Sequence, residues 1–136
     1  GSSNVTDIEY VTVPTTGNAT DFGDLTLARS FLGACSSTVR GVFGGGGTAS
    51  DPYRVNTIDY ITIQTTGNAT DFGDLTSARN NTPAACSNNT RGVFGSGYTT
   101  GYINTIDYIT IASTGNATDF GDLTVARSGI GACAGT

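Results

Sequence analysis

Acidic side chains recur at fixed positions of this sequence. A pair of aspartates follows an Asn-Ala-Thr turn three times, as Asp21/Asp24, Asp71/Asp74 and Asp119/Asp122. Ca²⁺ prefers oxygen ligands such as carboxylates, so Asp21, Asp71 and Asp119 are the calcium candidates. The spacing differs from that of an EF-hand loop, and Asn and Asp side chains also close their own turns. We therefore expect turns here, and neither a metal nor another cofactor.

Arginine recurs at two positions of the same pattern. One position holds Arg29, Arg79 and Arg127, and the other holds Arg40 and Arg91. These side chains could line a groove for an anionic or sugar ligand. The planar guanidinium also pairs with carboxylates, and we expect each to meet an aspartate of its own or the next repeat. With six basic against eleven acidic residues, the chain has no basic stripe that would indicate nucleic-acid binding.

Three cysteines stand at equivalent points, Cys35, Cys86 and Cys133. Zinc sites usually bring cysteines together in close pairs, whereas these are about 50 residues apart and the chain has no histidine. We expect small buried side chains. Because the number is odd, at least one thiol stays free unless chains are cross-linked.

Glycosylation sequons occur six times, and three of them lie in the repeated Gly-Asn-Ala-Thr turn. The glycosylation candidates are those three, Asn18, Asn68 and Asn116. In a secreted eukaryotic protein such residues accept glycans. A chain rich in Asn and Thr also produces sequons by chance, which is the reading we favour.

Templates for catalysis are missing from the sequence. Without histidine there is no Ser-His or Cys-His pair, and without lysine there is no Walker motif or Schiff base. We expect a protein that is not an enzyme.

A long internal repeat carries these residues. The string TGNATDFGDLT occurs identically at 16–26, 66–76 and 114–124, each time after a strand-like run such as IDYITI. A cysteine segment follows each copy, and RGVFG comes next at 40–44 and 91–95. The chain therefore reads as one array over 1–136. Its repeats are about 4–53, 54–101 and a truncated 102–136.

Alternating side chains and frequent Gly and Thr predict an all-β fold. Each repeat of about 50 residues reads as four short strands: IDYITI, TDFGD, the cysteine segment and RGVFG. No segment has the 3.6-residue period of a helix or the apolar length of a membrane helix. We expect a buried core made by recurring apolar residues, namely Ile58, Ile61, Ile63, Phe72, Cys86, Val93, Phe94 and their repeat equivalents.

The glycine run after VF at 42–47, the Asp-Tyr strand and the repeated arginine resemble kelch repeats. The Gly pair is Gly44-Gly45 in the first repeat but is interrupted as Gly95-Ser96-Gly97 in the second, and Phe stands where kelch repeats usually have Trp. The near-identical units are also similar to repeat-rich structural proteins of marine bacteriophages. The first resemblance implies four-stranded β-propeller blades. The alternative is a linear β-repeat fibre.

Together these features favour a structural or recognition module of a virion or another extracellular assembly. Two variable loops carry the ligand-binding candidates Tyr53, Arg54, Tyr98 and Tyr102, because aromatic and Arg side chains are enriched in binding surfaces. The ligand would be a glycan or a protein. A fibre subunit joined by strand pairing is the alternative, and a glycan-active enzyme on a propeller scaffold comes third.

The phase of the repeat predicts partners. Two to three blades are too few to close a propeller, and the RGVFG strand does not recur after Cys133. We therefore expect a homo-oligomer or a larger polymer, with neither nucleic-acid binding nor membrane insertion.

Overall fold

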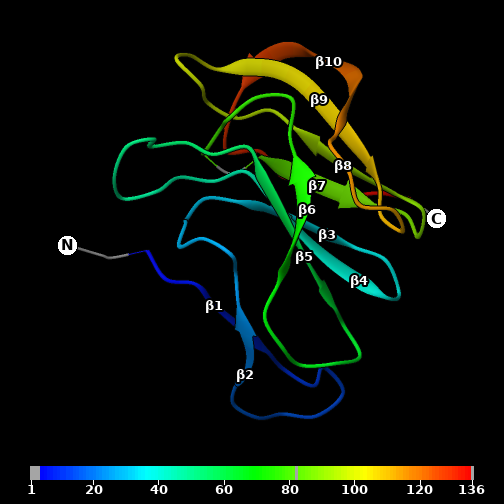
Figure 1. Cartoon of the computed structure of the whole chain (residues 1–136). Coiled ribbons are helices and arrows are strands. Elements are labelled where there is room, and N and C mark those ends of the chain that lie inside the picture. Colours follow the sequence, from blue (N-terminus) through cyan, green and yellow to red (C-terminus); the bar gives the residue numbers. More distant parts are fainter. Residues whose placement is uncertain (1–3, 82, 136) are drawn as a thin grey trace.

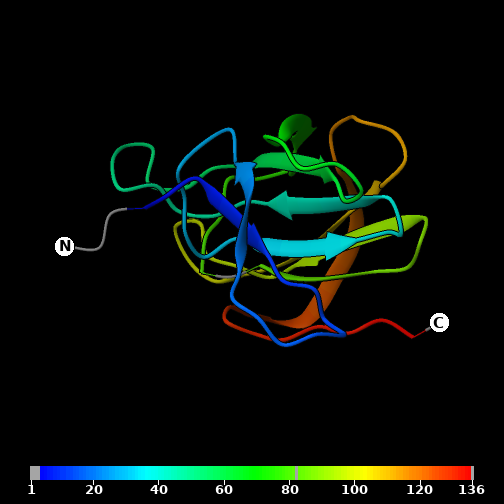
Figure 2. The ribbon, with the colours of Figure 1, turned by 90° about the horizontal axis from the view of Figure 1, so that it is seen from below.

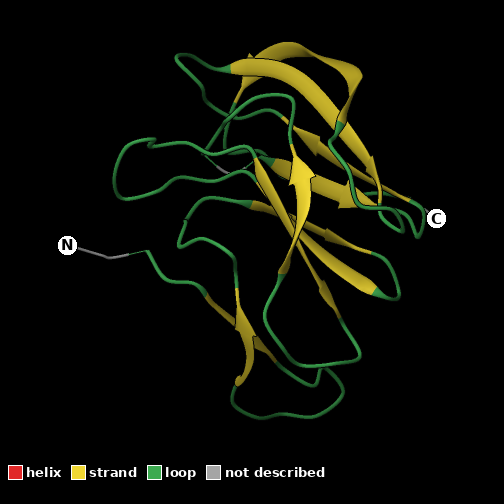
Figure 3. Ribbon diagram, viewed as in Figure 1, coloured by secondary structure: helices red, strands yellow, loops and turns green. Residues whose placement is uncertain are grey.

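The structure is a computed structural model that describes residues 4–81 and 83–135. These residues form ten strands and no helix, which confirms the all-β prediction (Figures 1 and 3). The strands are β1 (Asp7–Tyr10), β2 (Thr20–Asp24), β3 (Gly33–Ser36), β4 (Arg40–Gly44), β5 (Thr57–Thr62), β6 (Thr70–Asp74), β7 (Ala84–Ser87), β8 (Arg91–Gly95), β9 (Ile103–Thr110) and β10 (Thr118–Arg127).

The strands pair into three antiparallel sheets. Strands β1 and β2 form a two-stranded sheet, and β3-β4-β5-β6 and β7-β8-β9-β10 form two four-stranded sheets in sequential order. Each four-stranded sheet joins the cysteine and RGVFG strands of one sequence repeat to the first two strands of the next. All three sheets are open in the described part of the chain.

One expected strand is absent. Residues 131–135, which include Cys133, form no strand, whereas Cys35 and Cys86 lie in β3 and β7. Strands β3 and β7 each pair with the RGVFG strand that follows them, β4 or β8. In the described part of the chain, the backbone of residues 131–135 joins no such ladder.

The sheets are stacked in chain order. In Figure 1, β1–β2 lies at the bottom, β3–β6 in the middle and β7–β10 at the top, and Figure 2 views the stack from below. The middle and top sheets meet mainly where β3 contacts β7. We call the contact between the bottom and middle sheets the first junction, and that between the middle and top sheets the second junction.

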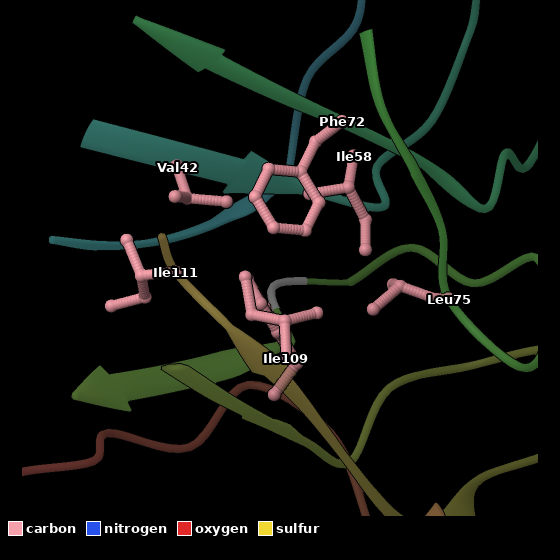
Figure 4. Packing of buried hydrophobic residues seen from close by; sticks show 7 residues of the cluster. Val42, Ile58, Phe72, Leu75, Ile109 and Ile111 are labelled. Atoms are coloured by element: carbon pink, nitrogen blue, oxygen red, sulfur yellow. The ribbon is translucent and has the colours of Figure 1, made fainter. Parts of the chain in front are cut away.

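Each junction has its own hydrophobic cluster. The second junction is formed by Val42, Ile58, Phe72, Leu75, Phe94, Ile109 and Ile111 (Figure 4). The first contains Ile8, Phe22 and Leu25, with Leu32, Phe43, Ile61 and Ala69 partly buried against them. Alternate residues of a strand face opposite sides of a sheet, which is why Val42 serves the second junction and Phe43 the first.

The expected core was right for some positions and wrong for others. Ile58, Phe72 and Phe94 are buried, while Ile61, Cys86 and Val93 are only half-buried. Ile63 is 39% exposed, although its equivalent Ile111 is 1% exposed. Ile63 lies just after β5, at the edge of the smaller first junction, where the opposite sheet has only two strands.

Candidate functional site

A buried carboxylate lies at the centre of the first junction. Asp59 on β5 is fully buried and accepts hydrogen bonds from the backbone N of Thr26 (3.2 Å), the Thr26 hydroxyl (2.7 Å) and Arg29 Nη2 (3.0 Å). Arg29 also donates to the carbonyls of Thr57 and Phe43. Thr26 and Arg29 follow β2 of the bottom sheet, and together they enclose an aspartate on β5 of the middle sheet. We call this arrangement the carboxylate clamp.

The second junction repeats the carboxylate clamp. Asp107 on β9 accepts from the backbone N of Thr76 (3.0 Å), the Thr76 hydroxyl (2.6 Å) and Arg79 Nη2 (2.8 Å). Burial lowers the pKa of Arg79, and Asp107 opposes that effect. The expectation that the repeated Arg pairs with an aspartate of its own or the next repeat is confirmed for Arg29 and Arg79. Arg127, the third equivalent, is exposed and donates from Nε to the carbonyl of Val125 (3.1 Å).

The Gly-Asn-Ala-Thr turn also reaches across each junction. Asn68 Oδ1 accepts from the backbone N of Asp24 at 3.1 Å, and Asn116 Oδ1 accepts from that of Asp74 at 3.0 Å. For these two residues, the expectation that the side chain closes its own turn is wrong. The stacking of the sheets brings β2 within hydrogen-bonding distance of the Asn68 amide, and β6 within that of the Asn116 amide.

Glycine permits this close approach. A Cβ at Gly23 would lie 2.3 Å from the carbonyl oxygen of Gly67, and one at Gly73 would lie 2.5 Å from that of Gly115. The turn therefore rests directly on the backbone of the neighbouring strand. At Gly121, the third equivalent, nothing lies within 4 Å.

The calcium candidates Asp21, Asp71 and Asp119 are all exposed. The Asp119 carboxylate accepts from the backbone N of Gly121 at 3.2 Å, at the bulge within β10. Across the described residues, no three His, Cys, Asp or Glu side chains converge in the manner of a metal site. The glycosylation candidates Asn18, Asn68 and Asn116 are also exposed, but Asn68 and Asn116 are engaged in the junctions through their amide oxygens.

The two variable loops bring three of the four ligand-binding candidates together. The guanidinium of Arg54 lies over the Tyr98 ring at 5.8 Å. The Tyr98 ring meets Tyr102 edge to face, with centroids 5.6 Å apart. Tyr53 and Tyr102 are 61% and 62% exposed. We call Arg54, Tyr98 and Tyr102 the aromatic cluster.

A hollow of about 350 Å³ lies beside the first variable loop. It is lined by Asn4, Leu27, Ala28, Thr48, Ala49, Ser50, Asp51, Pro52 and Val55. A larger open hollow of about 620 Å³ lies between the β3–β4 and β7–β8 turns, where hydroxyl and amide side chains of residues 36–38 and 87–90 gather with Ala134 and Gly135. Sequence reasoning missed this second hollow, because the turns that line it are about 50 residues apart.

The remaining repeated residues have structural contacts. Arg40 and Arg91 stack over Tyr60 and Tyr108 at 4.3 and 4.5 Å, instead of pairing with an aspartate as expected. Burial, with a smaller effect of Cys86, raises the pKa of the Cys35 thiol to about 12. All three cysteines are free thiols; Cys35 and Cys86 are half-buried and Cys133 is exposed, so the expectation of burial fails for Cys133.

No protein-family model matches the sequence, and no curated protein is found to be similar to it. The described part of the chain contains no helix of the length and apolar character needed to cross a membrane. Function is therefore inferred from the geometry of the chain itself.

Proposed function

We propose that this chain is a non-enzymatic recognition module, in which repeated sheets form a rigid framework and two variable loops bind a glycan or a protein. The aromatic cluster carries this proposal. Arg54 comes from one loop and Tyr98 and Tyr102 from the next. The Arg54 guanidinium lies over the Tyr98 ring across the loops, and Tyr98 meets Tyr102 within the second loop. Stacked aromatic and guanidinium groups with exposed faces are typical of binding surfaces.

Contrast with the framework supports this assignment. The clamp residues are identical in both junctions and lie between sheets, where Arg79 and Asp107 are 0% exposed. The aromatic cluster departs from the repeat, and Tyr102 is 62% exposed. Repeated buried residues serve a common framework, whereas unrepeated exposed ones are free to specify a ligand.

We propose further that the framework is a segment of kelch-like propeller in a virion or extracellular assembly. Two four-stranded meanders that follow the repeat and stack in order are compatible with successive blades. The sequence resemblance to kelch repeats and to bacteriophage structural proteins points the same way. A fibre subunit is the second candidate, favoured by the exposed sheet faces at both ends of the stack.

Binding to an array of neutral and sialylated oligosaccharides, together with capture of host-surface proteins, tests the ligand proposal. We expect the double variant Tyr98→Ala/Tyr102→Ala to lose at least about tenfold in affinity, because aromatic anchors dominate such surfaces. Val39→Ala, an exposed apolar change in the β3–β4 turn, is the matched control and should bind normally. Equal binding by the double variant would contradict the assignment.

A further inference from the structure

The top sheet presents a junction face that nothing in the described chain covers. Phe120 on β10 occupies the position of Phe72 and meets Tyr108 edge to face at 6.0 Å, as Phe72 meets Tyr60 at 5.9 Å. Yet Phe120 is 53% exposed and Phe72 only 2%. Arg127, the equivalent of the clamp residue Arg79, is exposed as well, whereas Arg79 is fully buried. Thr124 stands at the position of the clamp residue Thr76. We call Tyr108, Phe120, Thr124 and Arg127 the C-terminal face.

One backbone contact of the second junction recurs at this face. Gly97 N donates to the carbonyl of Arg127 at 3.2 Å, as Gly46 N donates to that of Arg79 at 2.8 Å. The side chain of Arg127 lacks an acidic partner among the described residues, whereas Arg29 and Arg79 each have one. The C-terminal face therefore carries the residues of one side of a junction, but the carboxylate that would face Arg127 is missing.

The bottom sheet presents the matching residues. Glu9 on β1 stands at the position of Asp59 and Asp107, and it is exposed. Val11 and Val13 stand at the positions of Ile109 and Ile111, but they are 55% and 89% exposed. The turn at Gly17 and Asn18 repeats the turns that cross the two inner junctions. We call Glu9, Val11, Val13 and this turn the N-terminal face.

We infer that the C-terminal face of one chain binds the N-terminal face of a second copy of this chain, head to tail, with Thr124 and Arg127 enclosing the carboxylate of Glu9. Phe120 then packs on Val11 and Val13, and the Asn18 amide oxygen accepts from the backbone N of Asp122, as Asn116 accepts from Asp74. The occupant is a copy of this chain because the chain itself carries both halves, with opposite charge.

The arrangement of the two faces defines the assembly. They belong to the bottom and top sheets of the stack, at opposite ends (Figure 1), so the contact is heterologous and copies add in one direction, to a closed ring or an open filament. The second copy contributes a two-stranded sheet, so its contact is smaller than the second junction and we expect association in the micromolar range. The inference rests on the proposed structural role and names the contact that would join the assembly.

Sedimentation of the full chain between about 1 and 200 μM tests it. We expect concentration-dependent association of the natural chain. Glu9→Arg and Arg127→Glu should each weaken the association constant by at least about thirtyfold, because each places like charges in the contact. Both side chains are exposed in the single chain, so circular dichroism and the Tm of each variant at 1 μM should match those of the natural chain.

Mixing the Glu9→Arg and Arg127→Glu variants is the decisive arm. In the mixture, the two substituted positions can face each other with opposite charges at one contact, and the two natural residues can do so at the other. Association should therefore return, and recovery supports the head-to-tail contact. A mixture as monomeric as the separate variants would overturn it, and so would a natural chain that stays at 13.8 kDa at 200 μM.

Asp51→Arg is the matched control, because it makes the same charge change on an exposed residue of the first variable loop, outside both faces. It should associate as the natural chain does; a loss equal to that of Glu9→Arg would show that net charge alone drives association and would overturn the contact. Glycan and protein binding by the loops is measured separately, on the monomeric Arg127→Glu chain. Failure of ligand recognition and failure of self-association are therefore distinguishable.

Discussion

The second and third copies of TGNATDFGDLT have the same eleven residues but different surroundings. In the second copy, Phe72 and Leu75 are each 2% exposed, and Thr76 and the following Arg79 enclose Asp107. In the third copy, Phe120 is 53% exposed and Arg127 has no carboxylate partner in the described chain.

Within their own sheets the two copies agree. The aromatic pair, the bulge in the strand pairing and the glycine φ values of 143° and 138° are alike. The repeat therefore encodes its sheet locally, whereas burial belongs to the contact between consecutive sheets. A residue of the type that packs in a junction therefore stays exposed where no second sheet packs against it.

The largest difference between the two copies is expected at the arginines. Arg79→Ala should lower the free energy of unfolding by about 3–5 kcal/mol, because it leaves the Asp107 carboxylate buried without its charge partner. Arg127→Ala should change it by less than about 0.5 kcal/mol at 1 μM. Urea unfolding of both variants measures this, and equal effects would show that the two copies have equivalent surroundings.

The phenylalanines should differ next. Phe72→Ala should cost about 3 kcal/mol or more, because it opens a cavity among Ile58, Ile109 and Ile111. Phe120→Ala removes a ring that is already half in water, so the expected loss is below about 1 kcal/mol. Thermal unfolding at low protein concentration, where chains stay separate, measures the two values. A large loss in Phe120→Ala would show that the third copy has a cover in the single chain.

A smaller effect is expected at the turn asparagines. Asn116→Ala should cost about 1 kcal/mol, because the backbone N of Asp74 loses its acceptor. Asn18→Ala should leave the unfolding of the dilute chain unchanged, because Asn18 lies on the exposed N-terminal face. Urea titration of both variants checks this ordering. Asn68→Ala, which removes the equivalent hydrogen bond of the first junction, serves as a further example.

The cysteines give the smallest effect at neutral pH. The pKa of Cys35 is raised from 9.0 to about 12, so the folded protein keeps this proton where the unfolded chain releases it. The contribution to stability is complete below pH 9.0 and is lost as pH rises from there to about 12.

Alkylation measures the same difference. At pH 8, Cys133 should react first and Cys35 at least about a hundredfold more slowly, since the thiolate is the reactive form. Mass spectrometry of the time course identifies the order. Equal rates at Cys35 and Cys133 would show that the second junction does not protect Cys35.

The ten strands and their order follow from the sequence alone, although the sequence also predicted a strand around Cys133 that does not form. Alternating IDYITI runs, glycine-bounded RGVFG segments and an identical turn predict a meander of short strands, because the backbone preferences of these residues are local. The recurrence of Arg at one position also predicted that Arg29 and Arg79 pair with an aspartate of their own or the next repeat, but not which aspartate. These inferences need only the sequence of one repeat and its neighbour.

Which copies are buried, and which side chains meet, depends on the packing of one sheet on another. Ile63 and Ile111, or Phe72 and Phe120, cannot be distinguished by residue type, because burial depends on the sheet packed opposite. The same holds for the aromatic cluster, because Arg54 and Tyr98 lie on separate loops and meet only when the middle and top sheets are stacked. Hydrophobic burial and a buried ion pair both depend on neighbours in space. A repeated sequence therefore encodes the residues on both sides of a junction, but not which of its sheets are packed against another sheet.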